Sequence, residues 1–493
     1  MAMKQTTKSL VTVLAFLAVA GVAALGALYV NKDEAKKAAA TEESAKFFAI
    51  DKAKARDLKL VRDGALVAEV KRASATAPWT LALPAQVAGA EADEATVSAI
   101  LDRLDSLRSK NTLDGMDAKA AGLDTPKLAV TVGEEGGKES TLLLGADNTF
   151  NQTTYAQKKG EAAIQAIATA DKAPFEKTVF DLRDKRVAHL DPGAEVRKIE
   201  VSGTQAPYTL EKDGADWKLA GAAGGKADAA AAANIARAVS ELKATGIAAE
   251  TADAARLAGL GLAPAKITAR LTLATPGGKD ALRTVLLGQP AQAQGSIKVT
   301  TVAKRDDSPT VFEVDSQIIR DLDKPLFDLQ DKSVLAFDRE QVRRIEVAAP
   351  GAQTISVARS KGPPPDGGVA EETFEVLAPT KGPANKWKMS GLLFALSGMK
   401  AAAMAVAVPA TAKGKAALGL DKPRTVTLFG EGDKVLARIF IGGEATVGVD
   451  ANKRRYVQVE GSPRAIPVEK GQLSQLPTAV SDVLQLDVKP TTH

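Results

Sequence analysis

Short stretches in which apolar and polar residues alternate occur along the whole chain, and such alternation predicts half-buried strands. Three of these strands are expected a few residues after Asp51, Asp191 and Asp338. They cover Leu58–Val61, Ile199–Val201 and Ile345–Val347. Because the same element returns in the same context, the chain is predicted to be an array of repeats.

Each copy contains a single tryptophan with an apolar residue two positions later. The pairs are Trp79 with Leu81, Trp217 with Leu219, and Trp387 with Met389. Side chains two apart on a strand share a face, so each pair is predicted to enter the core of its copy. An exposed tryptophan that stacks on a ligand is the alternative, and the recurring apolar partner favours the structural interpretation.

A helix is predicted next, because apolar residues follow at helical spacing. Asp93 and Asp228 are the expected N-caps in the first two copies. The apolar stripes are Val97, Ile100, Leu101, Leu104 and Leu107 in the first copy, and Ile235, Val239 and Leu242 in the second. The third copy offers Leu392–Met399, which contains Gly398 and is the least regular of the three.

A glycine turn ends each helical region, since glycine supplies a left-handed backbone and proline stops a helix. The turns are Gly122–Pro126, Gly261–Pro264 and Gly419–Pro423. Strands are expected after them over Leu128–Val132, Ile267–Leu273 and Thr425–Leu428. A further strand is expected to end on glycine at Leu144-Gly145, Leu287-Gly288 and Ile441-Gly442.

The first two copies close with nearly the same hexapeptide, FDLRDK at Phe180–Lys185 and FDLQDK at Phe327–Lys332. The third copy reaches Val483–Leu486 without it, as terminal repeats often depart from a pattern. The repeats predict an α+β fold of three tandem sheet-plus-helix units. Their expected bounds are 46–186, 187–333 and 334–493, and a length of 493 residues at about 150 per domain independently gives about three.

The N-terminal region predicts a membrane anchor. Leu10–Val30 contains no charged side chain and as a helix would span about 31 Å, close to a bilayer core. Lys4 and Lys8 precede it, which favours a cytoplasmic N-terminus. A cleaved signal peptide is the alternative. The expected order is a cytoplasmic tail at 1–8, a transmembrane helix at 9–30 and a stalk at 31–45.

Composition excludes several function classes. The 65 basic and 60 acidic residues are interspersed and only 4% of residues are aromatic, so a nucleic-acid surface is not expected. The chain has no cysteine, which excludes disulfides, and with only two histidines a zinc site is not expected. His189 and His493 have no partner that the sequence identifies, and a boundary or surface position is the preferred interpretation.

Motifs for phosphate binding and nucleophilic catalysis are incomplete. Gly224-Gly225-Lys226 and Gly136-Gly137-Lys138 lack the other residues of a phosphate loop and are predicted to be a turn and a hairpin. Ser397 and Lys400 have the Ser-x-x-Lys spacing of envelope hydrolases, but the partner motifs of that class do not occur. No catalytic, cofactor-binding or metal-binding residue is therefore assigned.

Charged residues that remain are predicted to serve structure. The pairs Glu134-Glu135, Asp306-Asp307 and Glu371-Glu372 are expected in solvated turns, and Lys453-Arg454-Arg455 beside Tyr456 on a charged strand face, with anionic lipid or glycan as the alternative ligand. The recurring Asp181 and Asp328, and likewise Asp184 and Asp331, are expected to cap or pair where two repeats join.

In this order, these motifs resemble the bacterial envelope family known as domain of unknown function 4340. The likeness rests on the N-terminal apolar helix, the Trp-x-Leu strand, the helix, the Gly-Leu-x-x-Pro turn and the Leu-Gly strand, and it covers nearly the whole chain from Leu10. It implies a membrane-anchored extracytoplasmic protein that accompanies ABC-type export or gliding-type transport systems. The family has no assigned catalytic residue, so none is carried over.

The expected function is that of a non-enzymatic scaffold or accessory subunit in an envelope transport or motility assembly. It would lie in the cell inner membrane as a single-pass protein with most of the chain in the periplasm. Its partners would be the membrane and proteins of an envelope complex, without nucleic acid or a cofactor. A glycan- or peptidoglycan-binding module is the leading alternative, followed by an envelope hydrolase.

Overall fold

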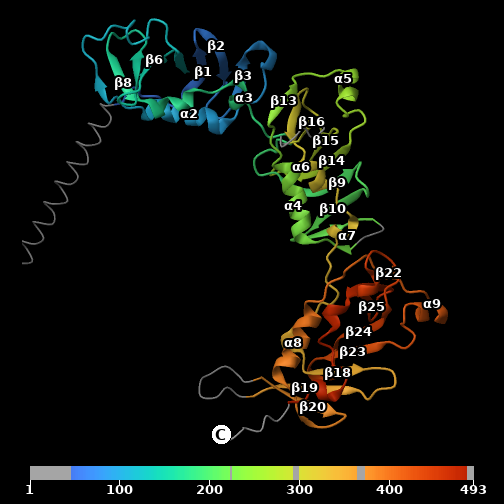
Figure 1. Ribbon diagram of the computed structural model, residues 1–493. Helices are drawn as coiled ribbons and strands as arrows, with labels where there is room; N and C mark the ends of the chain where they lie inside the picture. Colours follow the sequence, from blue (N-terminus) through green and yellow to red (C-terminus); the bar gives the residue numbers. More distant parts are fainter. Residues whose placement is uncertain (1–45, 222–224, 292–298, 363–371, 486–493) are drawn as a thin grey trace, which may run out of the picture. The chain divides into compact units, whose positions relative to one another are not determined.

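The computed structural model describes residues 46–221, 225–291, 299–362 and 372–485 (Figure 1). Within these ranges the chain is mostly β-sheet with few helices and forms three sheets, in agreement with the predicted α+β class and its three sheet units. The predicted tail at 1–8, transmembrane helix at 9–30 and stalk at 31–45 lie outside the described residues. No helix of the described ranges is long and apolar enough to cross a membrane.

The first sheet has eight strands in the order β3-β2-β1-β5-β6-β7-β8-β4, and each neighbouring pair is antiparallel. Its strands are β1 (Ala55–Arg62), β2 (Ala65–Lys71), β3 (Thr80–Leu83), β4 (Asn111–Thr112), β5 (Leu128–Glu134), β6 (Glu139–Asn148), β7 (Thr153–Lys158) and β8 (Ile164–Ala168). The helices are η1 (Ala85–Val87), α2 (Glu94–Ser106), η2 (Thr169–Phe175) and α3 (Val179–Leu182).

The second sheet has nine strands in the order β12-β11-β10-β9-β14-β15-β16-β17-β13. They are β9 (Glu195–Ser202), β10 (Tyr208–Asp213), β11 (Asp216–Leu219), β12 (Gly225–Lys226), β13 (Gly246–Ala249), β14 (Ile267–Ala274), β15 (Asp280–Leu287), β16 (Thr300–Arg305) and β17 (Val311–Asp315). The accompanying helices are α4 (Ala229–Ser240), α5 (Ala254–Gly259), α6 (Gln317–Leu322) and α7 (Leu326–Leu329).

The third sheet has nine strands in the order β21-β20-β19-β18-β23-β24-β25-β26-β22. They are β18 (Arg344–Ala348), β19 (Ile355–Lys361), β20 (Glu372–Ala378), β21 (Gly382–Pro383), β22 (Val406–Ala407), β23 (Arg424–Phe429), β24 (Val435–Glu444), β25 (Arg454–Val459) and β26 (Arg464–Glu469). The helices are η3 (Arg339–Gln341), α8 (Lys386–Ser397), α9 (Ala412–Ala417), η4 (Glu431–Asp433), η5 (Ala451–Lys453), η6 (Lys470–Leu473) and η7 (Val480–Asp482).

All three sheets share one topology. The chain first builds antiparallel strands outward from the centre, three in the first sheet and four in each of the others, and then passes through a helix to the far edge. There it adds a short strand, which is β4, β13 or β22, before it returns to the centre for the second half of the sheet. A shared path of this complexity confirms that the chain is built of repeats.

Contacts divide the chain into two compact units, and the division passes through the second sheet. One unit holds the described residues up to His189 together with Ser240–Ala265 and Val285–Ser316. The other holds Leu190–Val239, Lys266–Thr284 and the described residues from Gln317 onward. The expected repeat bounds 46–186, 187–333 and 334–493 concern the sequence period and stay a prediction.

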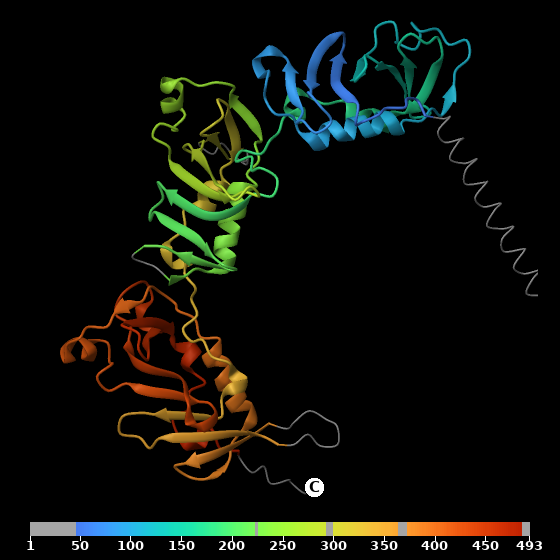
Figure 2. The same ribbon diagram turned by 180° about the vertical axis from the view of Figure 1, so that it is seen from behind.

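One long helix lies against a face of each sheet, as Figures 1 and 2 show for α2, α4 and α8. The expected caps are confirmed, because Asp93 accepts from the Thr96 amide at 2.7 Å and Asp228 from the Ala231 amide at 2.8 Å. The apolar stripe of α2 is buried as predicted. In the second copy Ile235 and Val239 are buried and Leu242 is half-buried.

The third helix was placed too late by the sequence pattern. It begins at Lys386 rather than at Leu392, and Asn385 caps it by accepting from the Lys388 amide at 3.1 Å. Its buried face consists of Met389, Leu392, Leu393 and Leu396. Asparagine is as good an N-cap as aspartate, so the start signal was present but lay ahead of the apolar run.

The three glycine turns have the predicted left-handed backbone, with φ of 69° at Gly122, 67° at Gly261 and 66° at Gly419. The leucine after each is buried. A Cβ on Gly145, Gly288 or Gly442 would overlap a carbonyl oxygen just before that turn. The paired motifs therefore meet backbone to backbone. Unlike the prediction, β6 and β24 continue past their glycines, whereas β15 does end directly before Gly288.

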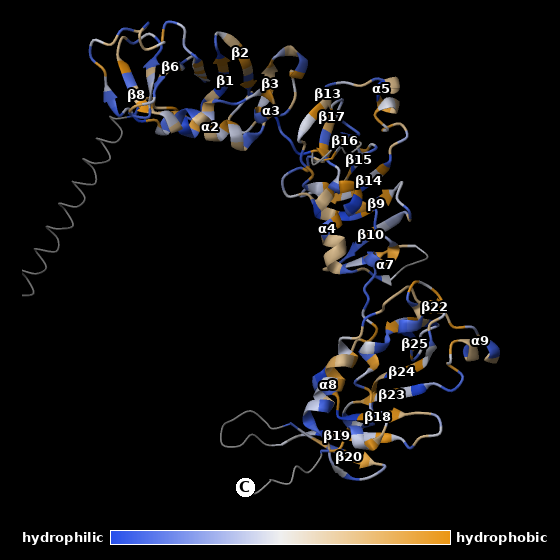
Figure 3. Cartoon of the chain, in the orientation of Figure 1, coloured by the Kyte–Doolittle hydropathy of each residue, from blue (hydrophilic) through white to orange (hydrophobic). Residues whose placement is uncertain are grey.

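Apolar and polar residues alternate along most strands (Figure 3), so both faces of a sheet have a defined role. In the first sheet the α2 face carries the main core. On the opposite face Leu143 and Tyr155 pack against a smaller cluster of Ala121, Leu123 and Ile164. The Gly-Leu turn thus covers the face that the helix leaves open.

The third tryptophan does not enter the core. Trp79 and Trp217 are buried as predicted, but Trp387 lies in α8 with 84% of its surface exposed. The equivalent core position is occupied by Phe374 of β20, which is buried. Its carbonyl accepts from the Ala384 amide at 2.9 Å. The carbonyl groups of Trp79 and Trp217 accept in the same way from Ala92 at 2.8 Å and Ala227 at 2.9 Å.

The shift follows from a longer connection between β19 and β20, which spans residues 362–371, whereas Gly214 and Ala215 alone join the corresponding strands β10 and β11. This longer connection shifts the core aromatic residue and the helix start together, because Phe374 precedes the cap Asn385 by 11 residues, as Trp217 precedes Asp228. Trp387 instead lies 13 residues after Phe374, at the start of α8. The insertion at Pro363–Pro365 had marked the third copy as irregular.

Each repeat closes on itself through the residue that caps its helix. The amides of Asp93, Asp228 and Asn385 donate to the carbonyl groups of Leu182, Leu329 and Val483 at 2.8, 2.9 and 2.8 Å. The third copy therefore has the closing segment although its sequence lacks the hexapeptide. Its aspartate is Asp482, which accepts from the Thr478 and Ala479 amides at 2.7 and 2.9 Å.

The corrected alignment makes a direct prediction for two aromatic residues. Replacing Phe374 by Ala should lower the stability of the third repeat by about 3–5 kcal/mol, because a buried ring is removed. Replacing Trp387 by Ala should change it by no more than about 0.5 kcal/mol, because the ring is exposed. Urea unfolding with hydrogen exchange of β20 measures both. Equal losses for the two variants would contradict the assignment.

Candidate functional site

The segment that joins the first sheet to the second is held on both sides by main-chain hydrogen bonds. The Asp184 amide donates to the Glu91 carbonyl at 2.9 Å. On the other side, the Ala244 amide donates to Lys185 at 2.7 Å and the Val187 amide donates to the carbonyl of Leu242 at 2.8 Å. All these residues belong to one compact unit. The segment Arg183–His189, called here the first junction, is therefore fixed in place.

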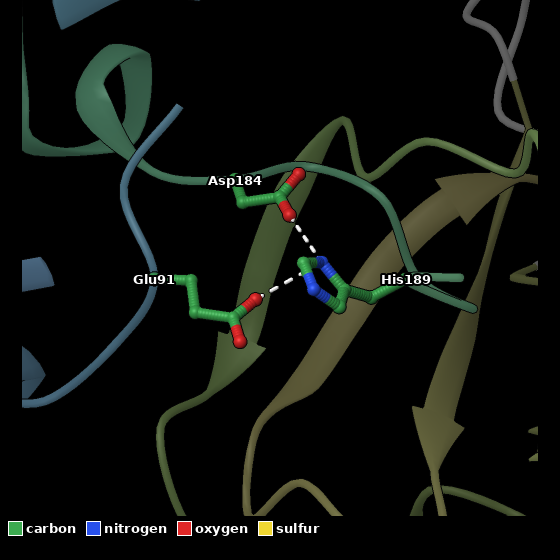
Figure 4. A group of neighbouring side chains, drawn as sticks. All are labelled: Glu91, Asp184 and His189. Atoms are coloured by element: carbon green, nitrogen blue, oxygen red, sulfur yellow. Dashed lines mark hydrogen bonds and ion pairs between the residues drawn. The ribbon is translucent and has the colours of Figure 1, made fainter. Parts of the chain in front are cut away.

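Three titratable side chains meet at this junction (Figure 4). His189 Nδ1 lies 2.5 Å from Asp184 Oδ2 and 2.9 Å from Glu91 Oε2. His189 has a φ of 42°, a left-handed conformation that is uncommon outside glycine and that turns the chain back at this position. The Asp184 side chain is 7% exposed, so the cluster has a buried and a solvent-facing side.

Arg186 completes the cluster from the same segment. Its guanidinium donates two hydrogen bonds to Asp184, from Nε to Oδ1 at 3.0 Å and from a terminal nitrogen to Oδ2 at 2.8 Å. The Arg186 amide also donates to Asp184 Oδ1 at 3.0 Å. Asp184 therefore accepts from the backbone and two cationic side chains, which charge-assisted hydrogen bonds make strong.

These contacts shift the pKa values in a consistent direction. Hydrogen bonds to Asp184 and Glu91 raise the pKa of His189 to about 9, so the imidazole is protonated at neutral pH. Burial alone would favour neutral Asp184, but the hydrogen bonds from His189 and Arg186 outweigh it and hold its pKa far below the usual range. The hydrogen bond from His189 likewise lowers the pKa of Glu91.

A second ion pair lies next to this cluster. Arg183 is 7% exposed at its side chain and donates to both carboxylate oxygens of Glu250, at 2.8 and 2.7 Å. Its other terminal nitrogen donates to Thr310 Oγ1 at 2.8 Å. The groups line a pocket of about 400 Å³ together with Arg305. One terminal nitrogen thus contacts both carboxylate oxygens, and such charge-assisted hydrogen bonds are strong.

The geometry limits what the cluster can do chemically. Glu91, Asp184 and His189 bring their ligand atoms within 4.8 Å of one another, the kind of set that suits a divalent cation. Such binding would require His189 to lose its proton and Arg186 to leave Asp184. A protonated imidazole also cannot act as a general base. With these partners, the cluster acts as a charge-paired joint.

The second junction has the same main-chain frame without most of these charges. The Asp331 amide donates to the Lys226 carbonyl at 2.9 Å, and the Val334 amide donates to Met399 at 3.0 Å. Asp331 accepts from the Ser333 amide at 2.9 Å. Ser333 and Ala336 stand where the first junction has Arg186 and His189. The frame is thus common to both junctions, and the charged cluster belongs to the first.

The recurring aspartates were expected to cap or pair, and they differ. Asp181 caps α3, because it accepts from the Thr178 amide at 2.9 Å and Oγ1 at 2.7 Å, whereas Asp328 makes no cap and pairs with Lys332 at 3.6 Å. The partners of His189 were missed by sequence reasoning. Asp184 is only five residues away, but Glu91 comes from a distant part of the chain. The one available signal was a histidine where the other copies have Ala49 and Ala336.

The residues of the Ser-x-x-Lys match do not meet. Ser397 Oγ donates to the Phe394 carbonyl at 3.0 Å, while Lys400 Nζ donates to Ser333 Oγ at 2.7 Å. The predicted hairpin at Gly136–Lys138 is confirmed between β5 and β6. Gly225 and Lys226 form the edge strand β12 rather than a turn, whereas Gly224 and His493 lie outside the described residues.

The carboxylate pairs are only partly in solvated turns. Asp306 and Asp307 are exposed as expected, and Glu371 lies outside the described residues. Glu134 is instead buried at the end of β5, where Lys138 pairs with its carboxylate at 3.1 Å and the Asp51 amide donates to it at 3.4 Å. The basic cluster follows the charged-strand prediction, with Lys453 to Asp450 at 3.1 Å and Arg454 to Glu469 at 2.8 Å. The neighbouring Tyr456 is buried and offers no stacking surface.

The joint predicts a specific dependence of stability on pH. Because the pKa of His189 rises from 6.5 to about 9 on folding, its contribution is complete below pH 6.5 and lost as pH rises through 9. Asp184 and Glu91 have lowered pKa values, so their contribution holds above the usual carboxyl range and is lost in acid. Replacing His189 by Asn, which tolerates a positive φ, should cost about 1–2 kcal/mol at pH 6 after solvent screening.

The loss of stability in the His189→Asn variant should shrink above pH 9. Urea unfolding at several pH values measures this loss, and a nuclear magnetic resonance titration measures the pKa of His189 in the unmodified protein. The matched control is Ala336→Asn, which puts the same side chain at the equivalent place in the second junction. A His189 titration midpoint near 6.5, or a loss that does not depend on pH, would contradict the joint.

The comparisons with known proteins agree with the repeated structure. The family model described as Domain of unknown function (DUF4340) matches residues 79–257 and again residues 217–375, so each match begins at a buried tryptophan. Together the matches extend over more than half of the 493 residues. No curated protein and no solved structure matches the chain. The chain therefore belongs to the family described as Domain of unknown function (DUF4340), whose model matches it twice over overlapping ranges.

Proposed function

We propose that the protein is a non-enzymatic scaffold or accessory subunit of an envelope transport or motility assembly. In this proposal an N-terminal helix tethers it to the cell inner membrane and the repeats project on the extracytoplasmic side. The tether is supported by the uncharged stretch Leu10–Val30 behind Lys4 and Lys8. The link to transport or motility is supported by the family resemblance.

One observation carries the non-enzymatic part of the proposal. The residues that recur from copy to copy contact each other inside their own repeat. The glycine turn meets the glycine strand, and the helix cap meets the closing segment, in each of the three copies. The need to fold therefore explains why these residues recur in each copy. An array of repeats with one core each and different outer surfaces suits a protein that presents contact sites.

The first junction supports a scaffold in a second way. The buried Arg183 pairs with Glu250, and His189 pairs with Asp184 and Glu91, so the first repeat is tied to part of the second through charged contacts. These contacts hold the first repeat to Ser240–Ala265 and Val285–Ser316 of the second within one compact unit. Contact sites on these elements are thereby kept together, which suits a scaffold.

The proposal predicts that tethering is essential to the cellular role. Replacing residues 1–30 with a cleaved secretion leader should release the repeats from the membrane and abolish capture of an envelope complex by crosslinking in intact cells. A matched control replaces 9–30 with an unrelated transmembrane helix and should retain capture. Mass spectrometry of the crosslinked products measures both.

Two results would contradict the proposal. Normal capture and normal cell behaviour with the released form would show that the tether is dispensable. Binding of the purified repeats to isolated cell wall, with no protein captured in cells, would favour the glycan- or peptidoglycan-binding module instead.

A further inference from the structure

The helix α8 of the third repeat exposes two large aromatic side chains. Trp387 is 84% exposed and Phe394 is 66% exposed, although the opposite face of the same helix is already buried in the core. A helix that is apolar on both faces has a second surface that the fold of its own repeat does not use. Figure 1 shows the place of α8 against the third sheet.

Comparison of the three helices shows that this second surface is particular to α8. Alignment on the caps Asp93, Asp228 and Asn385 places Trp387 with Ala95 and Ala230, and Phe394 with Asp102 and Arg237. All of these positions are exposed. Two of the three copies therefore fold with a small or charged residue at each position, and the aromatic rings of the third are not needed for packing.

The two rings lie on one side of the helix and frame a gap. Trp387, Gly391 and Phe394 follow the i, i+4, i+7 spacing, so they share a face and the outer two lie about 10 Å apart along the axis. A Cβ on Gly391 would meet only Gln475, at 3.7 Å. A side chain of a partner therefore has room to enter between the rings.

A hollow adjoins this gap. The pocket, of about 310 Å³, lies between α8 and the segment that runs from Ser474 to Val483, and Lys388 and Gln475 line it. Gln475 lines this pocket and is also the residue nearest to a Cβ at Gly391, so the pocket lies next to the aromatic face. An apolar anchor of a partner helix could enter this surface in the way that helices bind grooves.

The charges around the face indicate what kind of partner fits. Lys386 and Lys388 occupy the first turn of α8, and the helix contains no acidic residue. The positive end of the helix dipole makes lysines there unfavourable by about 0.3–1 kcal/mol. Within the described part of the chain neither lysine forms a salt bridge. Arg339 adds a further positive charge 5.4 Å from the Phe394 ring.

The nearby acidic groups offset this charge only in part. The hydrogen bonds from Ala479 and Thr478 and the nearby Lys388 lower the pKa of Asp482, so this carboxylate keeps its negative charge close to one of the two lysines. Glu340 pairs with Arg359 at 3.5 Å. A second copy of the chain would bring the same lysines together and is disfavoured. A partner with carboxylates would relieve the repulsion.

From these observations we propose that the outer face of α8 docks a partner-protein segment whose apolar side chains are flanked by Asp or Glu. The inference rests on the proposed scaffold function and names the surface through which the scaffold holds its partner. Trp387 and Phe394 provide the apolar contact, Gly391 the space between them, and Lys386 and Lys388 the pairing with carboxylates.

Site-specific photo-crosslinking of the full-length protein in intact cells tests the proposal. A benzophenone amino acid replaces Phe394, which keeps an aromatic ring there, and the matched probe replaces Asp102 on α2. We expect the Phe394 probe to capture a protein at a segment that is apolar and flanked by acidic residues. The Asp102 probe should capture this segment at least about tenfold less.

A competing variant shows whether the face itself is responsible. Trp387→Ala combined with Lys386→Glu and Lys388→Glu should reduce capture by the Phe394 probe at least about tenfold. The control is Phe150→Ala, which removes an aromatic ring that is 99% exposed in the first repeat and should leave capture unchanged. Hydrogen exchange of α8 and the third sheet verifies that the variants remain folded.

Other outcomes overturn the inference. Capture of lipid, of a basic segment, of a second copy, or of residues 363–371 or 486–493 of the same chain would assign the face to another occupant. Capture of proteins by probes elsewhere on the repeats but never from α8 would overturn the docking surface and leave the scaffold function standing. Absence of any captured protein from all probe positions would overturn both.

Discussion

The close approach between the Gly-Leu turn and the glycine of the next strand pair is the constraint on which each repeat depends. The chain crosses from the helix to the far edge of the sheet and must return to the centre, and this contact fixes where it does so. In the first repeat the Ala146 amide donates to the Ala121 carbonyl at 2.9 Å, beside Gly122 and Gly145. Neither glycine can carry a side chain there without moving the backbone.

Specific charges are added to this common frame at single places. Both junctions are built from the same main-chain hydrogen bonds, but only the first has His189 between two carboxylates and Arg183 paired with Glu250. Burial makes a lone charge costly, so these groups persist because each finds its partner. The aromatic face of α8 is the corresponding addition in the third repeat. An array can thus vary its surfaces while every unit keeps one core.

Sequence reasoning recovered what depends on short-range pattern. The strands, the first two helix caps, the glycine turns and the closing aspartates all follow from local spacing, and the structure has them. It failed where distance along the chain mattered. A longer connection before β20 moved Phe374 into the core position expected for Trp387, and Glu91 reaches His189 only through the fold. Glu134, expected in a solvated turn, is buried as the last residue of β5.

Stability measurements on single glycines test the central claim most directly. Gly145→Ala, Gly288→Ala and Gly442→Ala should each destabilise their own repeat by about 1–3 kcal/mol, as added volume in a closed contact does. Gly471→Ala, which has open space around it, is the control and should leave stability nearly unchanged. Hydrogen exchange of the amides in each of the three sheets measures the stability of each repeat separately. If all four variants behave alike, the recurring glycines are not packing residues and the account is wrong.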